Sequence, residues 1–197
     1  MATVSDISVF FEKFAPPHLA EAWDNTGLLI GRQTSVVKSI LTCLTVTPDV
    51  VDEAVDRGVD LIVSHHPVLF RGAKQISDAT AEGEMLLRLI ESRIAVYSPH
   101  TRFDSASQGI NQHLAECMDL SQIEPLRPHL ESADIGGGRI GNRETETTLR
   151  AFLEEFKSAT SAAYIEYVGE LDSPVRKVAV ACGAAAWFGW FGLFALV

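Results

Sequence analysis

Two histidines stand side by side directly after a run of apolar residues. The stretch DLIVSHHP places His65 and His66 at the end of a predicted buried strand, with Pro67 after them. Consecutive strand residues point to opposite faces, so both rings can serve one site only if the backbone leaves strand geometry. Pro67 favours that departure because it lacks an N–H and restricts the residue before it. Imidazole suits Zn, Fe or Ni, and mixed His/Asp sets also accept Mn, so the pair indicates a metal site.

A second histidine follows the next predicted strand. His100 comes just after IAVYS, and Asp104 lies four residues further on. Ligands of parallel sheets bind beyond the carboxyl ends of strands, so we expect the two loops to meet at one rim. Three imidazoles and a carboxylate there could hold two divalent cations that activate water for hydrolysis. A His-His-Pro turn whose side chains bond to backbone carbonyls is the alternative, and spacing alone leaves it open.

Other polar residues are assigned simpler roles. The stretch WDNTG, residues 23–27, is predicted to be a turn that packs Trp23, with Asp24 and Asn25 bonding locally. A role for this turn at the edge of the metal site is the alternative. Cys43 lies in a predicted strand and is interpreted as a core residue. The remaining histidines are interpreted as surface, capping or connector residues: His18, His113 and His129.

Helix and strand signals alternate along the first part of the chain. Thr3 and Asp6 have capping-box spacing, and Thr47-Pro48-Asp49 predicts a helix start with Gly58 as its stop. Strands are predicted at 35–47, 60–64 and 94–98, and helices at 84–92 and 108–118. This order predicts an α/β fold with a mostly parallel sheet flanked by helices.

The second part of the chain predicts an incomplete α/β lobe. We expect a first lobe at residues 1–118, a connector at 119–143 and a partial second lobe at 144–197. The connector is inferred from prolines, polar residues and the run of three glycines from Gly136. In the second lobe a helix is predicted at 146–157 and strands at 164–168 and 177–181.

Composition restricts the partners that the chain can have. The net charge is −10, which disfavours binding to nucleic acid. A small-molecule substrate is compatible with this charge. Three widely spaced cysteines give no disulfide framework and predict a cytoplasmic, reducing environment. The N-terminal residues have no basic region before their apolar residues, so we expect no secretory signal.

The C-terminal residues 178–197 contain no charged side chain. Three interpretations are open: a membrane anchor, a natural apolar end that packs on a partner, and a disrupted reading frame. The membrane anchor is disfavoured because the last 14 or so residues are too short to span a bilayer alone. We favour the disrupted frame.

Several motifs together resemble the Nif-three-like family, whose members are often described as GTP cyclohydrolase I type 2 or dinuclear-metal-centre proteins. They are WDNTGLLIG, LIVSHHPVLFRG, HTRFD, GGGRIG and VAVACG, in that order, between about Ser5 and Gly183. The resemblance implies two α/β lobes, two divalent cations and homo-oligomers that are often hexameric rings.

The resemblance also implies roles for individual residues. His65, His66 and Asp104 match metal ligands, and His100 matches a histidine that lies beside the metals or faces the substrate. The family also has a later Gly-His…Glu element that supplies two further ligands, and no histidine follows His129 here. The general base is not identifiable.

Two functions are therefore predicted. The first is a metal-dependent hydrolase that acts on a nucleotide-like substrate, as the resemblance implies. The second is a non-catalytic metal-binding scaffold, in which an incomplete ligand set holds the metal weakly.

Overall fold

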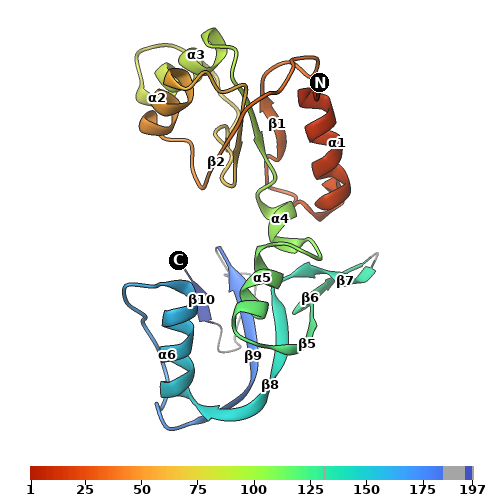
Figure 1. Cartoon of the computed structure of the whole chain (residues 1–197), viewed down its shortest axis with the longest axis vertical. Helices are drawn as coiled ribbons and strands as arrows, with labels where there is room; N and C mark the ends of the chain where they lie inside the picture. Colours follow the sequence, from red (N-terminus) through yellow and green to blue (C-terminus); the bar gives the residue numbers. More distant parts are fainter. Residues whose placement is uncertain (131, 184–193, 197) are drawn as a thin grey trace. The chain divides into compact units, whose positions relative to one another are not determined.

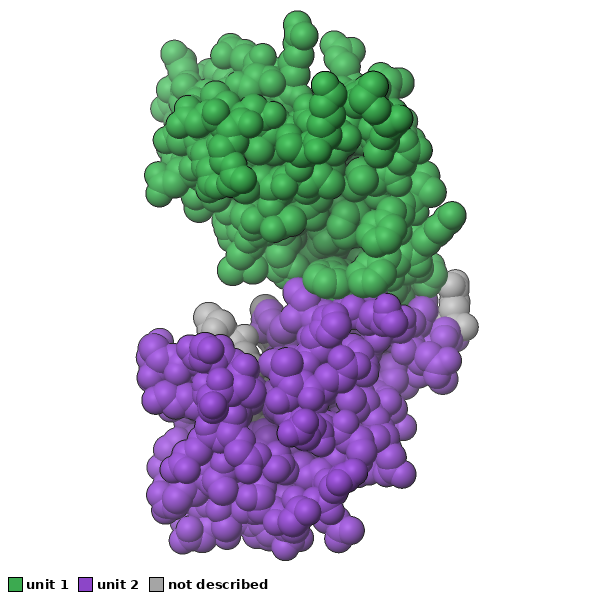
Figure 2. Space-filling view, viewed as in Figure 1, with its two compact units in different colours: residues 1–103 green, residues 104–197 purple. Residues whose placement is uncertain are grey.

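Four strands form the sheet of the first unit, residues 1–103 (Figures 1 and 2). Their order is β1-β4-β3-β2, with β1 at Gly27–Ile30, β2 at Ile40–Cys43, β3 at Leu61–Ser64 and β4 at Ala95–Ser98. Strands β2, β3 and β4 are parallel, and β1 pairs antiparallel with β4. The predicted α/β fold with a mostly parallel sheet is confirmed. The computed structural model describes residues 1–130, 132–183 and 194–196.

Three α-helices accompany this sheet, and start signals for the first two were readable in the sequence. They are α1 at Val4–Phe14, α2 at Pro48–Asp56 and α3 at Ala81–Glu91, and a short 3-10 helix covers Pro17–Leu19. Thr3 and Asp6 form the predicted capping box of α1. Thr47 accepts a hydrogen bond from the Val50 N–H and caps α2. These caps satisfy N–H groups that the first helical turn leaves without partners.

The two faces of the first sheet bury different apolar clusters. Ile62 and Val96 point into a cluster that contains residues of α2 and α3, such as Val51 and Leu89. The neighbouring residues Leu61, Ala95 and Tyr97 point to the other face and pack with residues of α1, such as Val4 and Phe11. Burial of one such large apolar side chain contributes about 1.5–3 kcal/mol. Strands β3 and β4 are therefore held firmly up to the residues that follow them.

The second unit, residues 104–197, has a different sheet (Figure 1). Its order is β10-β9-β8-β5, with β5 at Ser121–Glu124, β8 at Arg139–Thr148, β9 at Pro174–Cys182 and β10 at Phe194–Leu196. Strand β8 pairs antiparallel with both β5 and β9. The strands β6 at Arg127–His129 and β7 at Ser132–Gly137 form a separate two-stranded sheet. Helix α4, at Thr101–Ser105, includes residues on both sides of the division between the units, and the helices α5 at Ile110–Cys117 and α6 at Leu149–Thr160 belong to the second unit.

The second part of the chain differs from the sequence expectation in its secondary structure. Residues 119–143, expected as a connector, contain β5, β6, β7 and the start of β8. The division into units falls after residue 103 rather than after 118. The strand predicted at 164–168 is wrong, whereas the strand predicted at 177–181 lies within β9. The new strands depend on pairing between residues far apart in sequence, which local patterns do not report.

A buried arginine explains part of this difference. The side chain of Arg139 is 1% exposed, and its guanidinium donates hydrogen bonds to the carbonyls of Gly136, Gly138 and Ala106 and to the Gln112 side chain. The glycine-rich run is therefore a set of acceptors for Arg139 rather than a flexible linker. A Cβ on Gly136 would lie 2.1 Å from the Arg127 carbonyl oxygen, so the hairpin requires glycine there.

The apolar C-terminal stretch is described only in part. Residues 178–182 belong to β9, and residues 184–193 and 197 lie outside the described residues, as do the predictions made for them. Among the residues that are described, no helix is both long and apolar enough to cross a membrane.

Candidate metal centre

The first unit brings three strand ends to one edge of its sheet. Strands β2, β3 and β4 run parallel, so the residues after Cys43, Ser64 and Ser98 emerge at the same edge (Figure 1). His65 and His66 follow β3, and His100 follows β4 after Pro99. The fold therefore delivers the predicted histidines to a common rim.

The backbone leaves strand geometry at the histidine pair. The N–H of His65 donates to the Cys43 carbonyl at 3.1 Å, and the N–H of His66 donates to the Leu44 carbonyl at 2.8 Å. In a regular strand, successive N–H groups point to opposite neighbours, so two successive bonds to the β2 side mark a turn of the chain. This is the departure that the sequence required for both rings to share a site.

Two buried serines hold this turn. The hydroxyl of Ser64 donates to the His66 carbonyl at 2.9 Å and lies 2.7 Å from the hydroxyl of Ser98. Both serine residues are 0% exposed. They end adjacent strands, so the position of the His66 backbone is fixed relative to both β3 and β4.

The three imidazoles form one cluster. His65, His66 and His100 each offer one ring nitrogen, and these nitrogens all lie within 4.8 Å of one another. The ring centroids are 5.1 Å apart for His65 and His66, 5.2 Å for His65 and His100, and 5.7 Å for His66 and His100. Only small movements would bring the nitrogens to the spacing that a shared cation needs.

The surroundings favour neutral imidazoles. Burial, followed by the positive charges that His100 and His66 could carry, lowers the pKa of His65 to about 4. Burial and the nearby His100 also lower the pKa of His66. At neutral pH these rings carry a lone pair rather than a second proton, and that is the form that binds metals.

Hydrogen bonds from outside the cluster orient two of the rings. The Nδ1 of His100 lies 2.7 Å from the Asp24 carboxylate, whose side chain is 0% exposed. The Nδ1 of His66 lies 2.8 Å from the Thr45 hydroxyl. With Nδ1 engaged, each ring presents Nε2 as its remaining nitrogen. A carboxylate on the outer nitrogen is typical of metal-ligating histidines, because it fixes the tautomer and the ring plane.

Asp24 is held as an anion. Burial alone raises the pKa of its carboxyl, but hydrogen bonds from His100 and Thr101 outweigh burial, so that the pKa lies below its usual value. Sequence reasoning interpreted Asp24 chiefly as a local turn residue. It does accept the Asn25 N–H, at 2.7 Å, and it also reaches His100. Strand β1 begins at Gly27 opposite Ser98 and so carries residues 23–26 to this rim, a placement that depends on pairing with β4 and not on a local signal.

His100 also has an unusual backbone conformation. Its φ angle is +40°, in the left-handed region that side chains other than glycine seldom adopt. Such residues cost about 1–3 kcal/mol and persist where their surroundings hold them. Here the bonds from His100 and Thr101 to Asp24 supply that restraint.

Asp104, the predicted carboxylate ligand, is the first residue of the second unit. Its Oδ1 accepts a hydrogen bond from the Cys182 thiol at 3.3 Å, and its carbonyl accepts one from the Asn111 amide at 2.9 Å. It is not among the three residues of the histidine cluster. Its role as a metal ligand stays a prediction.

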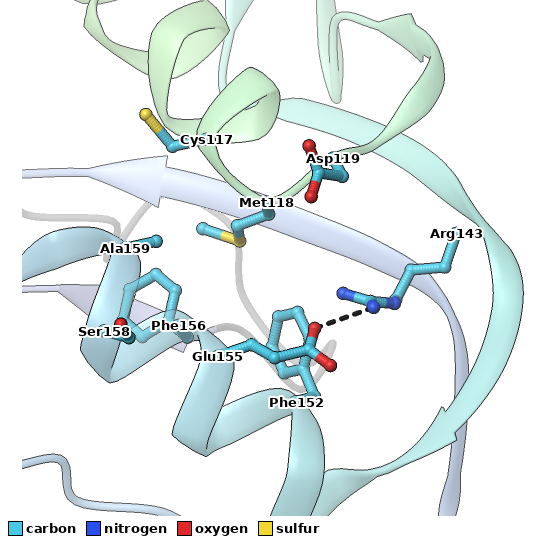
Figure 3. A pocket seen from close by; sticks show the side chains of 9 residues that line it. All are labelled: Cys117, Met118, Asp119, Arg143, Phe152, Glu155, Phe156, Ser158 and Ala159. Atoms are coloured by element: carbon cyan, nitrogen blue, oxygen red, sulfur yellow. Dashed lines mark ion pairs between the residues drawn. The ribbon is translucent and has the colours of Figure 1, made fainter.

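The second unit has a pocket of its own (Figure 3). It has a volume of about 370 Å³ and combines apolar side chains, such as Met118 and Phe156, with an ion pair of 2.7 Å between Arg143 and Glu155. The guanidinium of Arg143 also lies over the Phe152 ring, at 5.7 Å. None of the predicted site residues lines this pocket.

The donor set of the histidine cluster fits a divalent metal. Three imidazole nitrogens at one rim, two of them on rings oriented by outer hydrogen bonds, are the donors that Zn, Fe, Ni and Cu prefer. The residues present therefore fit a cation at His65, His66 and His100.

Comparison with known proteins identifies the family. The model of the Duf34/NIF3 (NGG1p interacting factor 3) family matches residues 2–189. The chain belongs to the Duf34/NIF3 family. A GTP cyclohydrolase 1 type 2 homolog of Clostridium acetobutylicum is 32% identical over 186 residues, which cover 94% of this chain and 69% of that protein. The NIF3 homolog of Schizosaccharomyces pombe is 33% identical over 191 residues, which cover 91% of this chain and 69% of that protein.

Solved structures agree with this assignment. A Bacillus cereus protein related to NIF3 superposes with a TM-score of 0.85 at 25% identity, covering 95% of this chain and 80% of that one. The Staphylococcus aureus protein SA1388 superposes with a TM-score of 0.87 at 24% identity, covering 95% of this chain and 74% of that one. The predicted resemblance to the Nif-three-like family is thus confirmed.

Proposed function

We propose that this Duf34/NIF3 chain binds divalent cations and acts as a metal-dependent hydrolase on a nucleotide-like substrate. His65 and His66 supply imidazole nitrogens, His100 completes the cluster, and Asp104 is the predicted carboxylate ligand. The observation that carries the proposal is the group of three ring nitrogens within 4.8 Å at the carboxyl edge of the sheet. The names of relatives such as the C. acetobutylicum protein support the nucleotide as the substrate class.

The chain's own residues would hold and orient the ions. Asp24 and Thr45 fix the rings of His100 and His66, and the depressed pKa of His65 keeps its nitrogen available at neutral pH. When bound, divalent cations supply Lewis-acid activation of water and of a substrate oxygen. We further propose two ions per chain, a homo-oligomer and a cytoplasmic location, in line with the family resemblance and the three free cysteines.

The metal content of the purified protein tests the first half of this proposal. We expect close to stoichiometric Zn, Fe, Mn or Ni in the wild type and a loss of most of it in the His65→Ala/His66→Ala double variant. His113→Ala is the matched control, because His113 is an exposed histidine that pairs with Glu116 on α5. A wild-type metal content near zero, or an equal metal content in the wild type, the double variant and His113→Ala, would refute the proposal.

Enzymatic turnover tests the second half of the proposal, which is the hydrolase activity. GTP hydrolysis that is abolished by a chelator and restored by added metal supports a hydrolase. Stoichiometric metal without turnover of GTP or of related nucleotides would instead favour the non-catalytic scaffold. The observation that keeps the scaffold open is that Asp104, the predicted carboxylate ligand, is not among the residues of the histidine cluster.

A further inference from the structure

Two large aromatic side chains stay exposed beside the histidine cluster. Trp23 is 45% exposed and Phe70 is 48% exposed. Their ring centroids lie 5.9 Å apart, and those of Trp23 and Phe70 lie 6.2 Å and 6.4 Å from that of His100. His100 therefore belongs to two groups at once, the imidazole cluster and this aromatic pair. Single exposed apolar residues are ordinary, but an adjoining pair that borders a cluster of polar ligands needs an explanation.

Hydrogen bonds hold the two aromatic segments in place. The N–H of Asp24 donates to the Glu21 carbonyl at 2.9 Å, which forms a turn that carries Trp23. The N–H of Glu21 in turn donates to the Thr101 hydroxyl at 3.1 Å. The side-chain amide of Asn25 donates to the Leu69 carbonyl, which joins this turn to the segment that carries Phe70. The backbone segments that carry the two rings are thus anchored to one another and to Thr101.

We propose that Trp23 and Phe70 form the subsite that binds the planar heteroaromatic ring of the substrate. The proposal deepens and rests on the proposed hydrolase function. The faces of flat aromatic side chains attract nucleobases by stacking, which tolerates different bases because every base has a π face. The two rings are tilted by 60° to one another, so one of them can stack on a base while the other contacts its edge. A base held there leaves the attached phosphate or ribose groups facing the imidazoles.

The charge distribution of the subsite suits this ligand. The carboxylate of Asp24 is buried and accepts hydrogen bonds from His100 and Thr101. It is therefore not exposed at the surface, where it would repel the phosphate of a ligand. Affinity for the ring should come from stacking, and affinity for phosphate should come from the metal centre.

Binding of three probes separates these contributions. The probes are GTP, guanosine, which has only the base and ribose, and inorganic tripolyphosphate, which has no base. Equilibrium dialysis is carried out with metal-loaded protein and, for guanosine, also with metal-stripped protein. The variants are Trp23→Leu and Phe70→Leu, which keep an apolar side chain but remove the flat ring. Phe10→Leu is the matched control, because Phe10 is an exposed aromatic residue of α1, at 58%, that contacts other phenylalanines.

We expect each subsite variant to weaken guanosine and GTP binding about 5- to 100-fold and to leave tripolyphosphate binding unchanged. Phe10→Leu should bind all three probes as the wild type does. Metal content and the midpoint of thermal unfolding are measured for every variant, so that a misfolded protein is recognised. In a Trp187→Phe/Trp190→Phe background, guanosine should also quench the fluorescence of Trp23, the one tryptophan left in the sequence.

Three results would overturn the proposal. They are guanosine affinity that is unchanged in both subsite variants, an equal loss of tripolyphosphate binding, and wild-type protein that binds GTP no better than tripolyphosphate. Because guanosine is also titrated into metal-stripped protein, stacking can be measured even if the chain holds no metal. A failure of the metal centre would lower both the metal content and tripolyphosphate binding. A failure of the subsite proposal would appear as unchanged guanosine affinity in Trp23→Leu and Phe70→Leu, so the two proposals fail in different measurements.

Discussion

The buried carboxylate of Asp24 should control how well the histidine cluster binds metal. We consider Asp24→Asn, which keeps the shape of the side chain but replaces one acceptor oxygen by an amide NH₂ group. In the wild type, Oδ1 faces His100 and the Asn25 N–H, and Oδ2 faces the N–H and the hydroxyl of Thr101. An asparagine cannot accept from both sides.

These contacts determine how much Asp24→Asn should change the folding stability and the metal affinity. If the asparagine oxygen stays on His100, its NH₂ group faces the N–H of Thr101, and a buried donor is left without an acceptor. This costs about 1–3 kcal/mol of folding stability. The bond to His100 also becomes a neutral one, which is roughly half as strong as a charge-assisted bond. Loss of a carboxylate behind a metal-ligating histidine typically lowers metal affinity about 10- to 100-fold, which is about 1.4–2.8 kcal/mol.

A chelator-competition titration with Zn²⁺ measures this change. The dissociation constant should rise about 10- to 100-fold in Asp24→Asn. Asp60→Asn is the control, because Asp60 also accepts backbone N–H bonds, from Lys38 and Ser39, but lies at the start of β3, away from the strand ends that carry the histidines. It should lower stability and leave metal affinity unchanged. Equal affinities in wild type, Asp24→Asn and Asp60→Asn would refute the idea that Asp24 orients a ligand.

Three further predictions concern folding and pH. Ser64→Ala should lower the free energy of unfolding, measured in urea, by about 1–2 kcal/mol and weaken metal binding, because the His66 carbonyl keeps only the 3.4 Å contact to Ser98. An unchanged unfolding free energy and metal affinity would contradict this. Arg139→Met should cost about 3–5 kcal/mol, since buried carbonyls lose their donors, and a loss below about 1 kcal/mol would show that the second unit does not depend on them. The metal-free protein should lose stability as the pH falls from 6.5 towards 4, because His65 binds a proton in the unfolded chain in this pH range and stays unprotonated in the folded chain. Thermal unfolding midpoints across this range should fall less steeply in His65→Gln, and an identical slope would exclude His65 as the cause.

The histidine cluster was predictable because it follows from local signals and one general rule. Short apolar runs identified β3 and β4, and ligands of parallel sheets gather beyond the carboxyl ends of strands. The register Leu61 opposite Ala95 makes the two strands end together, so His65 and His100 meet without any further assumption. His100 was predicted beside the metals, and the structure places it within reach of both other imidazoles.

The contribution of Asp24 was not predictable with the same rule. It depends on β1, a four-residue strand that runs antiparallel to β4, so that its beginning rather than its end lies at the rim. A run such as GLLI does not encode the direction in which it pairs, because direction is decided by contacts with residues some 70 positions away. Residues 119–143 show the same limit, since β8 is held by pairing with β9 and by Arg139 rather than by an apolar pattern.

Asp104 is the predicted ligand for which a structural role and a metal role have to be reconciled. The Asn111 side chain contacts two segments at once, because its amide donates to the Asp104 carbonyl and its oxygen accepts the Cys182 N–H at 2.8 Å. Cys182 adds the thiol bond to Oδ1 of Asp104, so the carboxylate is tied to the end of β9. A carboxylate has about four lone-pair sites, so one weak thiol bond does not prevent it from binding a cation. The same contacts would reduce the conformational entropy that Asp104 loses on ligation. The carboxylate of Asp104 is therefore fixed within the second unit, and its role as a metal ligand stays a prediction.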